Sequence, residues 1–392
     1  MSAALGAAVT AESERVLRQN WHEGEREGIR FSCTEPSPGR YPWQWYWDSC
    51  FAAIVWRRFE PGRARAELQS LLAVQRPDGF VGHTIFWRRR VSFLRSLFYN
   101  VSSRDALQTE TIQPPLLAWA WRIAVGDPGQ EPRIGAHMDW LAANRDLEGD
   151  GLLWIIQPDE SGLDASPKFE EVWGRRANGA GFPLLVRRNR KLGFDARRIR
   201  EHGHPVLCEA LVNTMWSLSL QAMGRPSATP ALVERLWDEG RGLFVDEALP
   251  GEIRPSAVTW ASLAPLALPD LPEAIGRRLV EEHLLNESEF LTPVAPPSVA
   301  ASEPSYEPDG GHSLIRRYWR GPTWVNSAWM VWLGMRRLGY EREAQRLADG
   351  VIAAVAREGL REYYDPRTGK GLGAKDFAWS ALVAELADPS PK

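Results

Sequence analysis

Apolar residues recur at helical spacing along most of the chain. Within each such stretch they return every three or four positions, so that they would line one face of a helix. The stretches predicted to be helical are 9–21, 49–58, 64–75, 106–123, 134–144, 205–223, 230–240, 258–267, 272–285, 322–338, 341–358 and 376–386. No stretch alternates between apolar and polar positions as a half-buried strand would. We therefore predict an all-α protein of about twelve helices.

Between the predicted helices lie long segments rich in Gly, Pro, Trp and acidic residues. They cover residues 35–48, 146–181, 292–318 and 363–373. Loops of this length in a compact domain usually carry function. Prolines placed just before predicted helices, at Pro61, Pro205 and Pro322, are typical of helix starts.

No low-complexity linker, charge block or sequence repeat divides the chain. A boundary near Gly193 or Gly224 is disfavoured, because segments with candidate chemistry fall on both sides of it. The pattern predicts one domain over residues 1–392, built as an (α/α)₆ barrel of helical hairpins. Long loops at one end of that barrel would form the functional site.

Charge and cysteine content narrow the possible partners and the compartment. The chain has 392 residues, with 47 Lys and Arg against 50 Asp and Glu, a formal net charge of −3. This balance argues against nucleic acid or an anionic membrane as a partner, since both require a basic face. Three widely spaced cysteines, Cys33, Cys50 and Cys208, form no paired motif, so neither a disulfide framework nor a zinc site is expected. With no basic leader and no apolar run of about eighteen residues, the sequence predicts a soluble, cytoplasmic protein.

Nineteen tryptophans accompany eight Tyr and thirteen Phe. They could enlarge the core or line a carbohydrate cleft, where flat indole faces stack on pyranose rings. Their position favours the cleft in segment 41–48, Tyr-Pro-Trp-Gln-Trp-Tyr-Trp-Asp, where aromatic side chains crowd against Asp48. Asp48 could alternatively be only a helix N-cap. A cap does not need Trp43, Trp45 and Trp47 beside it, so we interpret this segment as part of a sugar site.

A second candidate segment, residues 154–167, contains several carboxylates, among them Asp159. Asp150, a further carboxylate, lies shortly before this segment. The segment could be a solvated acidic loop or a calcium site, although its carboxylates fit no EF-hand pattern. A carboxyl group that holds a proton near neutral pH needs apolar surroundings, which raise its pKa. Trp154 and Pro158 would supply such surroundings for Asp159.

A third segment, residues 361–381, places Glu362 beside two tyrosines and before a run of glycines. Glu362 could simply close the preceding helix, whereas the aromatic pair and the glycines suit a site loop. Asp159 and Glu362 are far apart in the chain and can meet only through the tertiary fold. In an inverting glycosidase one carboxyl protonates the glycosidic oxygen and the other activates water, at a separation of roughly 6.5 to 9.5 Å.

These segments resemble glycoside hydrolase family 63, and within it most closely the bacterial mannosylglycerate and glucosylglycerate hydrolases. The similarity covers nearly the whole chain and is most specific at residues 41–49, 157–167, 317–326 and 362–381. It implies an (α/α)₆ barrel and inverting hydrolysis of a small carbohydrate, with Asp159 as general acid and Glu362 as general base. No metal or organic cofactor is implied.

The resemblance also implies a set of substrate contacts. Those at the glycone are Tyr41, Trp45 and Asp48, with Gln113 and Trp154 as further sugar contacts and Tyr318, Trp319 and Trp324 as an aromatic wall. Each aromatic residue could instead be core packing. Arg188 is the chosen partner for a substrate carboxylate, because a guanidinium pairs with that group through two hydrogen bonds. Arg187 and Arg190 are equally available in sequence, and a solvated basic run is the alternative.

Three residues depart from the pattern of the glycerate-processing enzymes. Phe86 and Phe194 stand where those relatives offer tyrosine hydroxyls, and Gln157 stands where a smaller residue occurs beside the acid. These departures bear on the aglycone more than on hydrolysis. The leading hypothesis is hydrolysis of an α-glycoside of glycerate, with glucose or mannose as glycone. The alternatives are a neutral disaccharide such as trehalose as substrate, or a carbohydrate-binding protein without catalysis.

Overall fold

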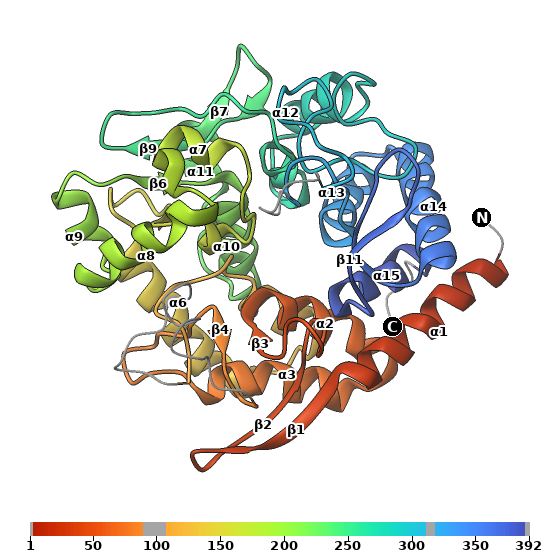
Figure 1. Ribbon diagram of the computed structural model, residues 1–392, viewed down its shortest axis with the longest axis horizontal. Coiled ribbons are helices and arrows are strands. Elements are labelled where there is room, and N and C mark those ends of the chain that lie inside the picture. The colour runs from red at the N-terminus through yellow and green to blue at the C-terminus, as the bar shows by residue number, and fades with distance from the viewer. Residues whose placement is uncertain (1–2, 89–106, 311–317, 389–392) are drawn as a thin grey trace.

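The computed structural model describes residues 3–88, 107–310 and 318–388. Helices dominate it and are arranged around a common centre in the view of Figure 1. The α-helices are α1 (Ala3–Asn20), α2 (Tyr46–Phe59), α3 (Pro61–Ala73), α5 (Leu117–Ala124), α6 (Glu131–Arg145), α7 (Lys168–Trp173), α8 (Phe182–Lys191), α9 (Ala196–Glu201), α10 (Ala210–Ala222), α11 (Thr229–Leu236), α12 (Glu273–Arg278), α13 (Val325–Arg337), α14 (Glu341–Glu358) and α15 (Val383–Ala387).

Shorter helices and strands connect these elements. The 3₁₀ helices are η1 (Pro128–Gln130), η2 (Pro158–Ser161), η3 (Gly174–Arg176), η4 (Gly179–Gly181), η5 (Trp260–Ala267) and η7 (Ala378–Leu382), and η6 (Leu279–Leu284) is a π-helical turn. The strands are β1 (Trp21–Arg26), β2 (Ile29–Thr34), β3 (Gln44–Trp45), β4 (Thr84–Ile85), β5 (Trp154–Ile155), β6 (Val206–Cys208), β7 (Trp237–Asp238), β8 (Leu243–Phe244), β9 (Glu247–Leu249), β10 (Arg361–Tyr364) and β11 (Gly371–Lys375).

The most buried helices pack against one another in succession. Helix α2 packs against α5, α5 against α10, α10 against η5, η5 against α13, α13 against η7, and η7 against α2. Residues 46–56 of α2 and 210–219 of α10 are buried without interruption, as expected for helices enclosed on all sides. Helix α1 packs against α14 and α15, so the first helix of the chain lies beside the last two in Figure 1.

Most predicted helices are present, with ends displaced by a few residues. The stretch 106–123 is an exception, because the helix begins only at Leu117. Pro114 and Pro115 lie just before it and disfavour helical backbone in the residues that precede them, while Ala106 lies outside the described residues. The stretch 258–267 forms the 3₁₀ helix η5, which contains Pro265.

The expectation that no strands occur was wrong in detail. Strands β1 and β2 form an antiparallel hairpin that pairs from Trp21 with Thr34 to Arg26 with Ile29. Its turn, Glu27 and Gly28, has positive φ angles of 55° and 78°, which suits a tight hairpin. Strand β1 is largely polar and exposed, so it carried no alternating apolar signal. The predicted helix start at Pro205 was also wrong, since residues 206–208 form β6 between β5 and β9.

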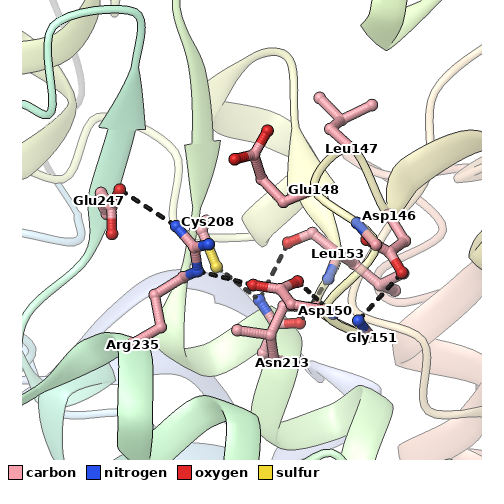
Figure 2. Close-up of polar contacts among 12 residues, drawn as sticks. Asp146, Leu147, Glu148, Asp150, Gly151, Leu153, Cys208, Asn213, Arg235 and Glu247 are labelled. Atoms are coloured by element: carbon pink, nitrogen blue, oxygen red, sulfur yellow. Dashed lines mark hydrogen bonds and ion pairs between the residues drawn. The ribbon is translucent and has the colours of Figure 1, made fainter.

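The acidic loop that leads from α6 into β5 is organised by its own carboxylates. Asp146 accepts hydrogen bonds from the backbone N–H groups of Gly149 and Gly151, at 2.7 and 3.0 Å, and Figure 2 shows the bond from Gly151. Asp150 forms an ion pair with Arg235 at 2.7 Å (Figure 2). The carboxylates of this loop therefore hold its turn and anchor it to α11.

Two further expectations concern compartment and chemistry. The three cysteines are free thiols, and all three are buried. No helix within the described ranges is long and apolar enough to cross a membrane.

Candidate active site

A cavity of about 560 Å³ opens among the loops and collects the predicted site residues. Its volume lies within the range of small-molecule sites. The predicted residues that line it are Tyr41, Trp45, Asp48, Gln113, Asp159, Tyr318, Trp319, Trp324 and Glu362. They come from all of the segments that sequence analysis singled out, although Arg317, the first residue of one motif, lies outside the described residues.

Glu362 is held firmly at this cavity. It lies on β10, which pairs with β11, and its side chain is 4% exposed. Tyr41 donates its hydroxyl to Oε1 at 2.9 Å, and the backbone N–H of Ala374 donates to Oε2 at 2.8 Å. Arg40 lies 3.5 Å from Oε2. Burial raises the pKa of Glu362, while Arg40, Ala374 and Tyr41 oppose that shift.

Gly373 makes this arrangement possible. It lies on β11 with a positive φ of 69°, and a Cβ placed there would lie 2.6 Å from Oε2 of Glu362. Only a residue without a side chain allows the backbone to approach the carboxylate this closely. The glycine-rich sequence after Glu362 is therefore the turn and second strand of a hairpin that cradles the carboxylate.

Asp159 occupies a different setting. It lies on η2, a single 3₁₀ turn, and its side chain is 14% exposed. The side-chain amide of Gln157 donates to Oδ1 at 2.8 Å, and Nδ1 of His83 lies 3.8 Å from Oδ2. Burial lowers the pKa of His83 to about 3, so this imidazole is neutral near neutral pH.

The residue after Asp159 anchors its turn. Glu160 is fully buried and forms two hydrogen bonds of 2.6 Å with the buried guanidinium of Arg145. The same carboxylate accepts the backbone N–H groups of Ile112 and Ile156, at 3.1 and 2.8 Å. Because Ile112 precedes the cavity residue Gln113, this ion pair ties two cavity segments together. Removing either partner would leave a buried charge unpaired.

Two more carboxylates face the same cavity. Asp48 lies in the first turn of α2, which begins at Tyr46, so the alternative that Asp48 is the N-cap was wrong. Burial raises the pKa of Asp48 well above its usual range, with a contribution from Glu362. Burial and Glu362 also raise the pKa of Asp164, opposed by the hydroxyl of Tyr318, which donates to Oδ2 at 2.9 Å. The cavity is therefore rich in carboxyl groups.

Aromatic rings form one wall of the cavity. Trp319 and Trp324 are stacked with centroids 4.0 Å apart and planes within 8°. Tyr318 stacks on Tyr363 at 6.0 Å, and Trp379 meets Trp324 edge to face at 5.3 Å. For Trp319, Trp324 and Trp379 the core-packing and cavity-lining interpretations both hold, because these three rings are buried and still line the cavity.

The assignment of Trp154 as a sugar contact requires correction. Trp154 is fully buried on β5, does not line the cavity, and its ring faces the guanidinium of Arg235 at 5.5 Å. Its alternative as core packing holds. A Trp three residues before Gln-Pro looks the same in sequence whether its side chain points toward a site or away from it. Pro158, the other apolar neighbour expected for Asp159, does line the cavity.

Arg188 does not line the cavity either. It is half-buried on α8, and its Nε and Nη2 donate to Oδ1 of the adjacent Asn189 at 3.1 and 2.9 Å. Helix α8 begins at Phe182, which does line the cavity, and Asn189, the residue after Arg188, donates to Gln157 near Asp159. Burial and the nearby Arg176 lower the pKa of Arg188 to about 10, which leaves it charged at neutral pH. Arg187, one alternative, is exposed.

Sequence reasoning missed several cavity residues. His83 directly precedes β4, which pairs with β3, and Asn178 belongs to a glycine-flanked segment before α8. Neither carries a motif, and only the tertiary fold brings them to the cavity. Arg40, which lies 3.5 Å from Glu362 but does not itself line the cavity, was also missed, although its position directly before the aromatic segment could have suggested it. Phe86 and Phe194, the expected departures, are buried and do not line the cavity.

No group of three or more His, Cys, Asp or Glu side chains is arranged to hold a metal ion in the part of the chain that the structure describes. The acidic segment that includes Asp159 is thus organised by hydrogen bonds and by the Arg145 ion pair. Its arrangement suits proton transfer between a carboxyl group and a bound ligand.

Comparisons with known proteins agree with the geometry. Residues 41–380 match the family described as the mannosylglycerate hydrolase MGH1-like glycoside hydrolase domain. The mannosylglycerate hydrolase of Rubrobacter radiotolerans is 30% identical, over 95% of this chain and 95% of that protein. The glucosylglycerate hydrolase of Mycolicibacterium hassiacum is 24% identical, over 89% of this chain and 92% of that protein. A GH63 mannosylglycerate hydrolase from Thermus thermophilus, crystallised with Tris and D-glycerate, aligns with a TM-score of 0.80 and 26% identity, over 96% of this chain and 99% of that chain.

Proposed function

Because the chain belongs to the mannosylglycerate hydrolase MGH1-like glycoside hydrolase family, we propose that it hydrolyses a small α-glycoside of glycerate with inversion of the anomeric centre. Glucose and mannose are both candidate glycones, since relatives named for each cover most of the chain. The products would be the free sugar and glycerate. The substrate is thus a small carbohydrate, and the reaction proposed uses only side chains of the protein.

The observation that carries this proposal is the meeting of Asp159 and Glu362 at one cavity in contrasting surroundings. We assign Asp159 as the general acid that protonates the glycosidic oxygen. Glu362 would be the general base that accepts a proton from the attacking water. Its two hydrogen-bond donors and the adjacent Arg40 favour the ionised form that a base requires.

The remaining cavity residues suit a sugar ring. Trp45 and the stacked pair Trp319 and Trp324 offer flat apolar surfaces, and Asp48 and Gln113 offer groups for its hydroxyls. The acidic character of the cavity would also stabilise the positive charge that develops on the sugar in the transition state. These features support placing the glycone against this wall.

The aglycone assignment rests on Arg188. Its half-buried guanidinium hydrogen-bonds to Asn189, which in turn hydrogen-bonds to Gln157, two residues before the cavity residue Asp159. The Thermus enzyme was crystallised with D-glycerate, a carboxylate ligand that a guanidinium suits. We propose that Arg188 reaches the substrate carboxylate after a change of side-chain rotamer, since it does not line the cavity now.

The fold and compartment belong to the same proposal. The succession of contacts from α2 through α5, α10, η5, α13 and η7 back to α2 supports an (α/α)₆ barrel formed as a single catalytic domain. The buried free thiols support a reducing compartment such as the cytoplasm.

A substrate panel tests the proposal. The wild-type enzyme would be assayed with α-glucosylglycerate, α-mannosylglycerate, the two matching glycerol glycosides and trehalose, and kcat/KM compared. A preference for a glycerate glycoside over its uncharged glycerol analogue is expected. Equal rates on the two analogues would refute carboxylate recognition, and a preference for trehalose would establish the neutral-disaccharide alternative.

A further inference from the structure

A continuous chain of side-chain hydrogen bonds links Arg188 to Asp159. The guanidinium of Arg188 donates twice to Oδ1 of Asn189. Nδ2 of Asn189 donates to Oε1 of Gln157 at 2.9 Å, and Nε2 of Gln157 donates to Oδ1 of Asp159 at 2.8 Å. Asn189 and Gln157 are both fully buried. We call these two residues, with Arg188, the amide chain.

The direction of every bond in the amide chain is determined by its first member. A guanidinium has only donors, so Asn189 must turn its carbonyl oxygen toward Arg188 and its NH₂ toward Gln157. Nδ2 of Asn189 also donates to the backbone oxygen of Ile156 at 3.1 Å, which supports the same orientation. Gln157 must then turn its oxygen toward Asn189 and its NH₂ toward Asp159. As long as Arg188 donates to Asn189, the amide chain therefore presents a donor to Oδ1 of Asp159.

We propose that the amide chain positions the acid, holding Oδ1 of Asp159 as an acceptor so that the catalytic proton resides on Oδ2, and that it couples Asp159 to the group bound by Arg188. Gln157 and Asn189 are positioning residues in this proposal, which rests on the proposed function of Asp159. Oδ2 is the oxygen nearer His83, a residue that lines the cavity. A substrate carboxylate that engages Arg188 would thus act on the same amide chain that orients the acid.

The amide chain has a defined effect on the pH dependence of hydrolysis. Among the residues that the structure describes, the titratable and charged groups near Asp159 include His83, the Glu160–Arg145 ion pair, and the cavity carboxylates Asp48, Asp164 and Glu362. A general acid works in its protonated form, so activity falls as the pH rises through the pKa of that acid. A donor to Oδ1 favours the ionised form, and its removal raises the pKa of Asp159. The alkaline limb of the pH–rate profile should then move to higher pH.

Neutral substitutions test the proposal without changing local charge. Gln157→Met removes the donor to Asp159, and Asn189→Leu removes the group that orients Gln157 but never touches Asp159. With a neutral methyl α-glycoside, Gln157→Met should move the alkaline limb of kcat/KM upward by about 0.5 to 1 pH unit and lower the maximal kcat roughly tenfold. Asn189→Leu should move it in the same direction by less. The matching α-glycosyl fluoride, whose leaving group scarcely needs a proton, should keep most of its kcat in both variants.

Controls separate positioning from loss of fold and from failure of the proposed function. Arg187 is an exposed residue of the same helix, so Arg187→Met should leave the pH–rate profile unchanged. Arg188→Lys keeps the charge but loses the fork on Asn189, and should produce a small upward shift even if the buried variants do not fold. If the variants fold and their alkaline limb does not move, the proposed role of the amide chain is wrong, while the proposed hydrolytic function still stands. A wild-type enzyme inactive on every α-glycoside would instead overturn the proposed function.

Discussion

The two catalytic candidates are held in contrasting ways. Glu362 lies on a β-hairpin, is 4% exposed, and takes hydrogen bonds from the main chain at Ala374 and from Tyr41. Asp159 lies on a single 3₁₀ turn, is 14% exposed, and accepts a hydrogen bond from the side-chain amide of Gln157. A base that must aim one water molecule benefits from rigid main-chain support. An acid that must deliver a proton to a leaving group benefits from side-chain support, which can adjust when that leaving group binds.

The largest expected effects come from removing each carboxyl in turn. Asp159→Asn should reduce the hydrolysis of a methyl α-glycoside by about 10²- to 10⁴-fold, but that of the glycosyl fluoride much less. Glu362→Gln should depress both substrates alike, because both need an activated water. Steady-state rates on the two substrates measure this difference. Equal losses in Asp159→Asn would contradict its assignment as the acid.

The rigid support of Glu362 depends on the close approach of the backbone at Gly373, which a side chain there would prevent. Gly373→Ala places a Cβ 2.6 Å from Oε2 of Glu362 and should lower kcat about a hundredfold on both substrates by displacing the carboxylate. Gly359→Ala is a matched control, since Gly359 also has a positive φ, of 74°, but has open space around its Cβ position. Gly359→Ala should lower stability with little change in kcat. Comparable kcat values for the two variants would show that the close approach is unimportant.

On the side of the acid, the proposed contact between Arg188 and the substrate carboxylate can be removed. A guanidinium–carboxylate pair contributes about 1.5 to 3 kcal/mol, so Arg188→Met should lower kcat/KM for the glycerate glycoside about ten- to a hundredfold. The glycerol analogue should lose only the smaller amount that passes through the amide chain. Thermal unfolding of the variant monitors the fold. An equal loss of kcat/KM on both substrates would show that Arg188 has only a structural role.

The smallest effect concerns the pH dependence of the base. Burial raises the pKa of Glu362, and Arg40 is the strongest opposing influence. A base works in its ionised form, so activity is lost as the pH falls through this pKa. Arg40→Gln should raise the pKa further and move the acidic limb of kcat/KM upward by less than about one unit. Tyr41→Phe should move it in the same direction by less, and a downward shift in either variant would contradict this electrostatic account.

How much the sequence could predict differs between these two sides. The aromatic residues around Asp48, and the glycines after Glu362, sit in short motifs whose side chains serve one local structure, so sequence revealed them. Trp154 was misplaced because a two-residue strand leaves no periodicity to show which way an indole points. Gln157 was noted only as a departure, since its bond to Asn189 joins segments that meet through packing of α8 on the acid turn.

The helices follow the same division. Helix α14 was predicted to the residue from its regular apolar spacing, whereas α1, also eighteen residues long, begins six residues before the predicted start. Short elements in the loop regions, such as α7 and the β10–β11 hairpin, were not, because tertiary contacts rather than periodicity determine them.

The anomeric outcome tests the central claim most directly. Proton NMR during hydrolysis of the preferred α-glycoside by the wild-type enzyme identifies the sugar anomer released before mutarotation. Because Glu362 is proposed to deliver water opposite the leaving group protonated by Asp159, the β-anomer should appear first. Initial release of the α-anomer would show retention, and would contradict the assignment of Glu362 as a base acting through water.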